Sequence, residues 1–214
     1  VNDIFFRHVY NPVNLDIGSN DIVVDIGTHV GIFTLFAACR TQNTVYAFEP
    51  SPRNFEFLKR NIRANGVSNV ITHNFAVSDK IGSTKLILHP GTNVGDLLSD
   101  HLIPDKLEEY KTSPGKLGNY VEVPTTTLQD IMDSNHIEQI DFLKMDCEGS
   151  EGSILQSMPK EYLKKVNKIA MEFHDHLSRL DHNDLQKLLQ EAGFNTKLKW
   201  DNKSSCGYLY GWRN

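Results

Sequence analysis

Residues 24–31 read Val-Asp-Ile-Gly-Thr-His-Val-Gly (VDIGTHVG), and they stand between an apolar run and a helical pattern. Two glycines four residues apart, directly after a buried strand, indicate a turn where the backbone comes close to a ligand. Three kinds of ligand fit such a turn: a dinucleotide, a nucleoside triphosphate, and a nucleoside derivative without phosphate. The residues inside the turn discriminate among them.

The glycine turn lacks the residues that hold phosphate groups in nucleotide-binding loops. A Walker loop needs Gly-Lys-Ser/Thr, whereas Gly31 is followed by Ile32 and Phe33. A dinucleotide loop needs Gly-x-Gly-x-x-Gly, and the middle glycine is absent between Gly27 and Gly31. The carboxylate of Asp25, just before the turn, repels a pyrophosphate but attracts a cationic amino acid or sulfonium. The pattern favours S-adenosylmethionine over NAD.

A second acid supports a nucleoside ligand. Glu49 directly follows the apolar run VYAF, in the position where a strand ends. An acid at the tip of the second strand accepts hydrogen bonds from both ribose hydroxyls of an adenosine. Because NAD contains the same ribose, Glu49 supports a nucleoside without separating the two cofactors.

Short apolar runs alternate with longer helical patterns along the chain, which is typical of a mostly parallel sheet with helices on both faces. The 214 residues, 39% hydrophobic and 23% charged, fit a single α/β domain over residues 1–214. The expected strands are 22–24, 44–48, 70–75, 140–145 and 166–173, the expected helices include 32–39 and 52–65, and residues 195–200 and 206–211 predict a closing hairpin.

Residues 82–123 break this alternation. The segment begins with a strand-like pattern and continues with many glycines and prolines, and it is too long for an ordinary connection. Long connections inside compact domains are often lids or binding loops, so we predict a lid or acceptor-binding insertion at about 90–120. A disordered surface loop is the alternative.

Charge and cysteine content exclude several classes of protein. The net charge of −5 and the pI near 6.0 leave no basic surface typical of nucleic-acid binding. No apolar run is long enough to predict a membrane span. Cys39, Cys147 and Cys206 are widely spaced, so neither a disulfide framework nor a zinc site is expected, and a reducing, cytoplasmic compartment is favoured.

Three segments carry a family resemblance in their sequence, order and spacing. They are residues 23–38 (VVDIGTHVGIFTLFAA), 45–62 (VYAFEPSPRNFEFLKRNI) and 140–155 (IDFLKMDCEGSEGSIL). Over residues 21–174 the chain resembles the FkbM family of S-adenosylmethionine-dependent methyltransferases. The resemblance implies a doubly wound, Rossmann-like methyltransferase sheet with a reversed C-terminal strand. It also implies O-methylation of a hydroxyl on a sugar, polyketide or other secondary metabolite, with S-adenosylhomocysteine as product.

The cofactor is expected beyond the carboxyl ends of the strands, where open α/β sheets bind their ligands. Phe75 is predicted to cover the adenine face, with Asn74 at its edge; the alternative is that Phe75 belongs to the core. The family usually has Ala-Asn in place of Thr28-His29. The predicted cofactor residues are Asp25, Gly27, Thr28, His29, Gly31, Glu49, Pro50, Asn74, Phe75, Ala76 and Asp146.

Methyl transfer to an aliphatic hydroxyl requires a base that takes the proton as the new bond forms. The candidates are His174, Glu148 and Glu151, at or after the ends of the fourth and fifth strands. With an ordinary pKa, His174 is mostly neutral at pH 7 and accepts the proton, while Glu148 orients the hydroxyl. The alternative for Glu151 is an acid that interacts with a helix N-terminus.

Several alternatives stay open at this stage. We predict no resident metal, and magnesium held by Asp146, Glu148 and Glu172 is the alternative. The expected partner is a small-molecule or glycan hydroxyl acceptor. A nicotinamide-dependent oxidoreductase and a non-catalytic nucleoside-binding module are the competing functions.

Overall fold

A seven-stranded sheet forms the centre of the protein in a computed structural model, which describes residues 15–88, 96–112, 120–200 and 204–213 together with residues 4, 9, 10 and 12. For residues 109–112 only the backbone is described. In spatial order the strands are β10 (Asn195–Lys199), β11 (Cys206–Trp212), β9 (Val166–His174), β8 (Ile140–Met145), β1 (Val23–Ile26), β2 (Val45–Phe48) and β3 (Val70–His73).

The strand order reverses next to β1. From β1 the chain proceeds through β2 to β3 on one side, and it later adds β8 and β9 on the other side, all parallel. β11 runs antiparallel to both β9 and β10. The doubly wound sheet, the reversed strand and the closing hairpin are thereby confirmed. The crevice between the ends of β1 and β8 is where such sheets bind ligands.

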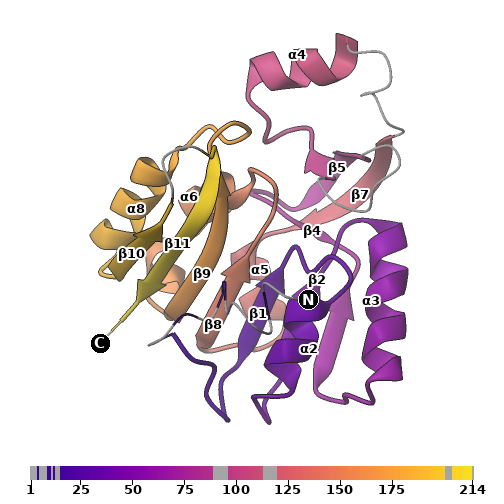
Figure 1. Ribbon diagram of the computed structural model, residues 1–214, viewed down its shortest axis with the longest axis vertical. Coiled ribbons are helices and arrows are strands. Elements are labelled where there is room, and N and C mark those ends of the chain that lie inside the picture. Colours follow the sequence, from indigo (N-terminus) through magenta and orange to yellow (C-terminus); the bar gives the residue numbers. More distant parts are fainter. Residues whose placement is uncertain are drawn as a thin grey trace.

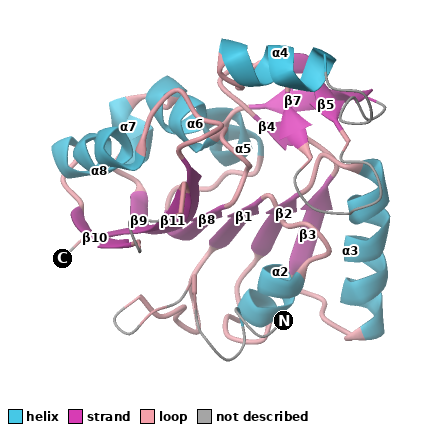
Figure 2. Cartoon of the chain, turned by 45° about the horizontal axis from the view of Figure 1, so that its top comes forward, coloured by secondary structure: helices cyan, strands magenta, loops and turns pink. Residues whose placement is uncertain are grey.

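Helices cover both faces of this sheet (Figures 1 and 2). They are α2 (Ile32–Ala38), α3 (Pro52–Ala64), α5 (Leu128–Ser134), α6 (Glu151–Ser157), α7 (Lys160–Leu163) and α8 (His182–Glu191). Neighbouring residues of a strand point to opposite faces, so Val24 packs in the cluster with α5, α6 and α8, while Val23 packs in the cluster with α2. Both faces are buried, which explains the continuous apolar runs of these strands.

A second sheet lies beyond the carboxyl ends of the large sheet's parallel strands, with a helix above it (Figures 1 and 2). Its strands, in spatial order, are β4 (Ala76–Val77), β7 (Tyr120–Thr126), β5 (Gly82–Ile87) and β6 (Leu97–Leu98), and the helix is α4 (Pro104–Thr112). The disordered-loop alternative for residues 82–123 is therefore wrong for the described part. Residues 89–95 and 113–119 of the predicted insertion lie outside it.

The second sheet is tied to the rest of the molecule. Leu97 and Leu102 are buried in one cluster with Leu177 from the loop after β9. The amide of Ile103 donates a hydrogen bond to the carbonyl of Leu177 at 3.3 Å. This part of the predicted lid is thus anchored by apolar packing as the structure stands. None of the helices in the described ranges is long and apolar enough to pass through a bilayer.

Candidate active site

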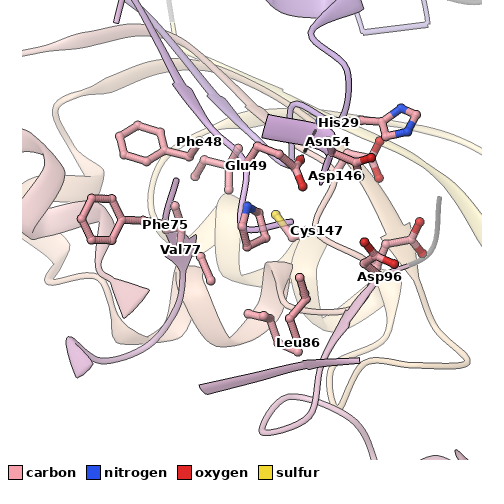
Figure 3. Close-up of a pocket in the computed structure, with 16 residues that line it drawn as sticks. His29, Phe48, Glu49, Asn54, Phe75, Val77, Leu86, Asp96, Asp146 and Cys147 are labelled. Atoms are coloured by element: carbon pink, nitrogen blue, oxygen red, sulfur yellow. Dashed lines mark hydrogen bonds between the residues drawn. The ribbon is translucent and has the colours of Figure 1, made fainter. Parts of the chain in front are cut away.

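A pocket opens where β1, β2 and β8 end, and the second sheet forms its far wall (Figure 3). In this view Phe48, Phe75 and Val77 lie on one side of the pocket, and Glu49, Asp96 and Asp146 lie on the other. Of the predicted residues, those that line it are Gly27, His29, Glu49, Pro50, Phe75, Ala76, Asp146 and Glu148. Eight of the fourteen predicted residues therefore meet in one place.

Glu49 is held rigidly at this pocket. Its Oε2 accepts a hydrogen bond from the amide of His29 at 2.7 Å, and its Oε1 accepts one from the amide of Ser51 at 2.9 Å. Burial raises the pKa of Glu49 to about 7, and the two amide donors oppose that rise. Each carboxylate oxygen keeps a lone pair for a further donor, which is what two neighbouring ribose hydroxyls need.

Asn74 and Phe75 are neighbours in sequence, but of the two only Phe75 lines the pocket. The Asn74 side-chain amide donates to the carbonyls of Glu49 at 2.7 Å and Pro50 at 3.1 Å. Asn74, a predicted cofactor residue, therefore fixes the turn after β2 and is not among the residues that line the pocket. Phe75 is 38% exposed and lines the pocket, so the alternative that it belongs to the core is wrong.

Asp25 lies behind the pocket instead of in it. It is fully buried, accepts a hydrogen bond from the Thr34 hydroxyl at 2.6 Å and lies 3.3 Å from Lys144 Nζ. Burial raises the pKa of Asp25, and the charge of Lys144 partly offsets this. The side chain of Asp25, a predicted cofactor residue, thus points into the sheet layer covered by α2, and it is not among the residues that line the pocket.

Lys144 is a site residue that the sequence analysis missed. Its ammonium group donates to the carbonyl of Gly27 at 2.7 Å and lies 3.8 Å from Asp146. Burial opposes its charge, but Asp25 and Asp146 outweigh burial, and the pKa of Lys144 is raised. The available signal was a lysine inside the otherwise apolar end of the strand IDFLKM.

The two glycines of the VDIGTHVG turn serve different purposes. Gly27 has a φ of 74°, and a Cβ there would collide with the carbonyl of Asp146. Gly31 has a φ of 85°, and its Cβ would collide with the side chain of Leu58 on α3. Gly27 thus permits close approach of β1 and β8 at the switch point. Gly31, also a predicted cofactor residue, allows helix packing and is not among the residues that line the pocket.

A second pocket adjoins the first across Asp146. It shares Gly27, His29 and Asp146 with the first pocket, and Thr28, Lys144, Glu172 and Tyr10 also line it. The Thr28 hydroxyl is buried there without a hydrogen-bond partner among the described residues. Thr28, a predicted cofactor residue, therefore lines the adjoining pocket and not the first one.

Tyr10 connects the N-terminal segment to the ends of β8 and β9. Its hydroxyl lies 2.8 Å from a carboxylate oxygen of Asp146 and 2.8 Å from one of Glu172. One phenol proton can serve one carboxylate at a time. Burial and then the two acids raise the pKa of Tyr10 well above its ordinary value, and burial raises the pKa of Glu172. Tyr10 thus keeps its proton, and its hydroxyl donates to one of the two carboxylates at a time.

The three predicted catalytic side chains are together. His174 lies between two glutamates, with Nε2 at 3.4 Å from Glu148 Oε2 and Nδ1 at 3.4 Å from Glu151 Oε1. Burial acts to lower the pKa of His174, but Glu151, Glu148 and Asp146 together raise it to about 10. The expectation of a neutral imidazole is therefore wrong for the structure as it stands, because the sequence did not reveal how closely the carboxylates surround it.

Glu148 and Glu151 occupy different environments. Glu148 lines the first pocket, has a φ of 52°, and burial raises its pKa to about 7. Glu151 is fully buried and accepts hydrogen bonds from the amides of Cys147 at 2.8 Å and Gly149 at 3.0 Å. Glu151 thus holds the turn after β8 and cannot touch a ligand in the pocket. Glu151, predicted as a catalytic residue, is thus placed outside the pocket lining.

The comparisons with known proteins are consistent with this site. The model of the family described as "Methyltransferase FkbM domain" matches residues 25–196. The 31-O-demethyl-FK506 methyltransferase FkbM of Streptomyces tacrolimicus is 26% identical, over 93% of this chain and 82% of its own length. The hexuronic acid methyltransferase AglP of Haloferax volcanii is 26% identical, over 84% of this chain and 65% of its own length.

A solved structure supports the fold. The methyltransferase FkbM of Methylobacillus flagellatus superimposes with a TM-score of 0.61 at 18% identity, over 99% of this chain and 47% of that chain. At this identity the similarity establishes the shared architecture.

Proposed function

The chain belongs to the FkbM methyltransferase family, and we propose that it transfers the methyl group of S-adenosylmethionine to a hydroxyl oxygen of a small-molecule or glycan acceptor. The observation that carries the proposal is Glu49: a buried carboxylate, fixed by two backbone amides and facing a pocket at the switch point. That arrangement suits the ribose of an adenosine.

The arrangement of the pocket supports an orientation for the cofactor. With the ribose at Glu49, the exposed ring of Phe75 is available to the adenine. The methionine part then runs over the turn at Gly27 and His29, which line both pockets. This orientation brings the methyl group to the ends of β1 and β8, next to Asp146 and Glu148.

The chemistry at that point fits an oxygen acceptor. The acceptor oxygen, the methyl carbon and the sulfur must be collinear, and the hydroxyl proton must leave as the bond forms. Glu148 faces the pocket with His174 at 3.4 Å behind it, so a carboxylate is available to take the proton. Two relatives whose names specify an oxygen position or a hexuronic acid support an oxygen-bearing acceptor.

The acceptor is bounded by the second sheet in this proposal. Asp96 and Leu98, from the predicted insertion at about 90–120, line the pocket opposite the strand ends. We assign this insertion to acceptor binding within a single methyltransferase domain.

Calorimetry and a transfer assay test the proposal. The chain should bind S-adenosylhomocysteine and not NAD, and it should transfer a labelled methyl group to members of a panel of sugars and polyhydroxylated compounds. Binding of NAD in place of S-adenosylhomocysteine would support the oxidoreductase alternative. Cofactor binding with transfer to amines only would exclude an oxygen acceptor.

A further inference from the structure

Asp146, Glu148 and His174 form a cluster at the rim shared by β8 and β9. Each residue offers one ligand atom, and these atoms all lie within 4.8 Å of one another. His174 ends β9, and Asp146 and Glu148 follow the end of the neighbouring parallel strand β8, so the pairing of the two strands brings the three residues together. Two carboxylate oxygens and one imidazole nitrogen are a donor set that divalent cations accept.

We propose that Asp146, Glu148 and His174 bind a divalent cation of the Mg²⁺/Mn²⁺ class, which chelates an acceptor carrying two neighbouring oxygens. The inference rests on the proposed methyl transfer to oxygen. It replaces Glu172 of the magnesium alternative with His174, because the ligand atoms of Asp146, Glu148 and His174 are the ones that lie within 4.8 Å of one another. The imidazole nitrogen favours Mn²⁺ over the harder Mg²⁺.

His174 provides an observation that is independent of the acidic residues. It is 5% exposed, and its Nδ1 has no hydrogen-bond partner among the described residues. Nε2 faces the cluster opposite Glu148, while Nδ1 faces the buried carboxylate of Glu151. With a carboxylate behind Nδ1 and carboxylate oxygens before Nε2, a neutral His174 would have the usual arrangement of a metal-binding imidazole.

The ligands are supported from behind. Glu151 accepts the amides of Cys147 and Gly149, which fixes the turn that carries Glu148. The Tyr10 hydroxyl holds one oxygen of Asp146. The carboxylate of Glu148, in contrast, accepts no hydrogen bond from any residue in the described ranges, and its side chain is 31% exposed. Its contact with His174 at 3.4 Å is an ion pair that a cation between the two groups would replace.

The excess of carboxyl groups around the cluster also favours binding of a cation. Among the described residues, five carboxyl groups gather around the cluster with two cationic groups, Lys144 and the protonated His174; the carboxyl groups are those of Asp25, Asp146, Glu148, Glu151 and Glu172. Lys144 is engaged by Asp25 and by the carbonyl of Gly27. Neighbouring ligands of a cation with bonds of about 2.1 Å lie about 3 Å apart, so the cluster must contract slightly around the ion. His174 gives up its extra proton to solvent when it binds.

Three protein ligands leave about three positions of an octahedral cation for other molecules. A vicinal diol or a 2-hydroxy acid fills two of them, which selects such acceptors over isolated alcohols. Coordination makes the hydroxyl more acidic, and its proton passes to a carboxylate or solvent. The oxygen forms the new bond to the methyl carbon. The carbon–sulfur bond breaks, and its electron pair stays on sulfur as S-adenosylhomocysteine is released.

The test is Mn²⁺ binding by the EDTA-treated, dialysed protein saturated with S-adenosylhomocysteine, followed by the electron paramagnetic resonance signal of free Mn²⁺. One Mn²⁺ should bind per chain, and Glu148→Gln and His174→Asn should each weaken binding at least tenfold. The matched control is Asp79→Asn, because Asp79 lies 3.4 Å from His101, the same separation as in the proposed site. That variant should bind Mn²⁺ within twofold of the native protein.

Calorimetry with S-adenosylhomocysteine on every variant separates a lost ion site from lost folding. Glu148→Gln is the decisive variant, since its partly exposed side chain demands least of the fold. Cofactor binding without Mn²⁺ binding would overturn the inference and leave the proposed function intact. Equal Mn²⁺ affinity in the native protein and Glu148→Gln would overturn it as well. Absence of cofactor binding in the native protein would contradict the proposed function itself.

Discussion

The ends of β2 and β8 each carry a glutamate whose pKa is raised to about 7, yet the two side chains are held in opposite ways. Glu49 is 5% exposed and bound by two backbone amides, whereas Glu148 accepts no hydrogen bond within the described part of the chain. Glu49 is preorganised for neutral donors such as hydroxyls. Glu148 is surrounded mainly by charged groups and responds to a proton or a cation.

The comparison separates binding from chemistry. A ligand hydroxyl gains most from an acceptor that does not have to be reorganised, which describes the β2 end. A reacting oxygen needs a group that can accept its proton or hold its counter-ion, which describes the β8 end. In this interpretation, variants at β2 change cofactor affinity, and variants at β8 change the rate.

The largest expected effect concerns the β8 end. Glu148→Gln and His174→Asn should each lower kcat for methyl transfer by about 10²–10⁴, because the first removes the carboxylate that takes the hydroxyl proton and the second removes the imidazole that lies 3.4 Å from it. S-adenosylhomocysteine affinity should change less than threefold, as measured by calorimetry. Single-turnover transfer of a labelled methyl group gives the rate. A near-native rate in both variants would show that the cluster has a structural role only.

The next effect concerns the lysine between the two ends. Lys144→Met leaves the fully buried Asp25 without its cation and should lower the free energy of unfolding by about 3–5 kcal/mol. The double variant Asp25→Asn/Lys144→Met should regain part of that loss, because it buries no unpaired charge. Urea unfolding followed by circular dichroism measures both. Equal stability of the two variants would mean that the ion pair does not support this region.

Affinity for the cofactor should depend on the β2 end. Glu49→Ala removes the acceptor of two ribose hydroxyls and should weaken S-adenosylhomocysteine binding by about 1.5–3 kcal/mol, about ten- to hundredfold. The control is Glu191→Ala, an exposed glutamate whose side chain is 69% accessible. Calorimetry on the three proteins decides the matter, and unchanged affinity in Glu49→Ala would remove this residue from the cofactor site.

The strands of the large sheet could be predicted because their signals are local. Buried parallel strands are continuous apolar runs, and Ile140–Met145 was placed with its observed bounds. The second sheet was harder to predict, since β4 and β6 contain two residues each and have no period to detect. Its helix α4 lies in a segment rich in turn formers.

The site was predictable in position and less so in chemistry. Strand tips identify which residues meet, and Glu49, Glu148 and His174 are found where the sheet places them. The charge of His174 depends on Glu148 and Glu151, which lie more than twenty residues away in sequence and come close only through the pairing of β8 with β9. The pairing of Asp25 with Lys144 has the same origin. Such effects depend on side-chain distances, which a single sequence does not contain.

The pH dependence sharpens the same comparison. Hydroxyl donors favour the ionised form of Glu49, whose pKa is about 7, so cofactor affinity should rise about tenfold from pH 6 to pH 8. Because this pKa lies above the ordinary value of 4.5, the folded state binds the proton more tightly than the unfolded state does. The contribution of Glu49 to stability is therefore lost as pH rises from about 4.5 through 7.

Glu49→Gln isolates both consequences. Its cofactor affinity should be nearly independent of pH between 6 and 8. Its thermal midpoint should gain on that of the native protein as pH rises, which differential scanning fluorimetry can follow. If the two proteins kept parallel pH profiles, the carboxylate of Glu49 would not titrate in this range.

The smallest expected effect concerns two histidines in the left-handed region of backbone conformation. His29 has a φ of 53° and lines both pockets, whereas His136 has a φ of 54° and is exposed away from them. A side chain in this region costs about 1–2 kcal/mol relative to glycine, so His29→Gly and His136→Gly should each raise the melting temperature by about 2–4 °C.

The amide of residue 29 that donates to Glu49 survives the change, so the β2 end should remain intact. His29 lines both pockets and His136 lines neither. His29→Gly should therefore weaken S-adenosylhomocysteine binding by a few fold, while His136→Gly should leave it unchanged. A gain in stability without loss of affinity at position 29 would show that the strained residue is retained for a reason other than the cofactor.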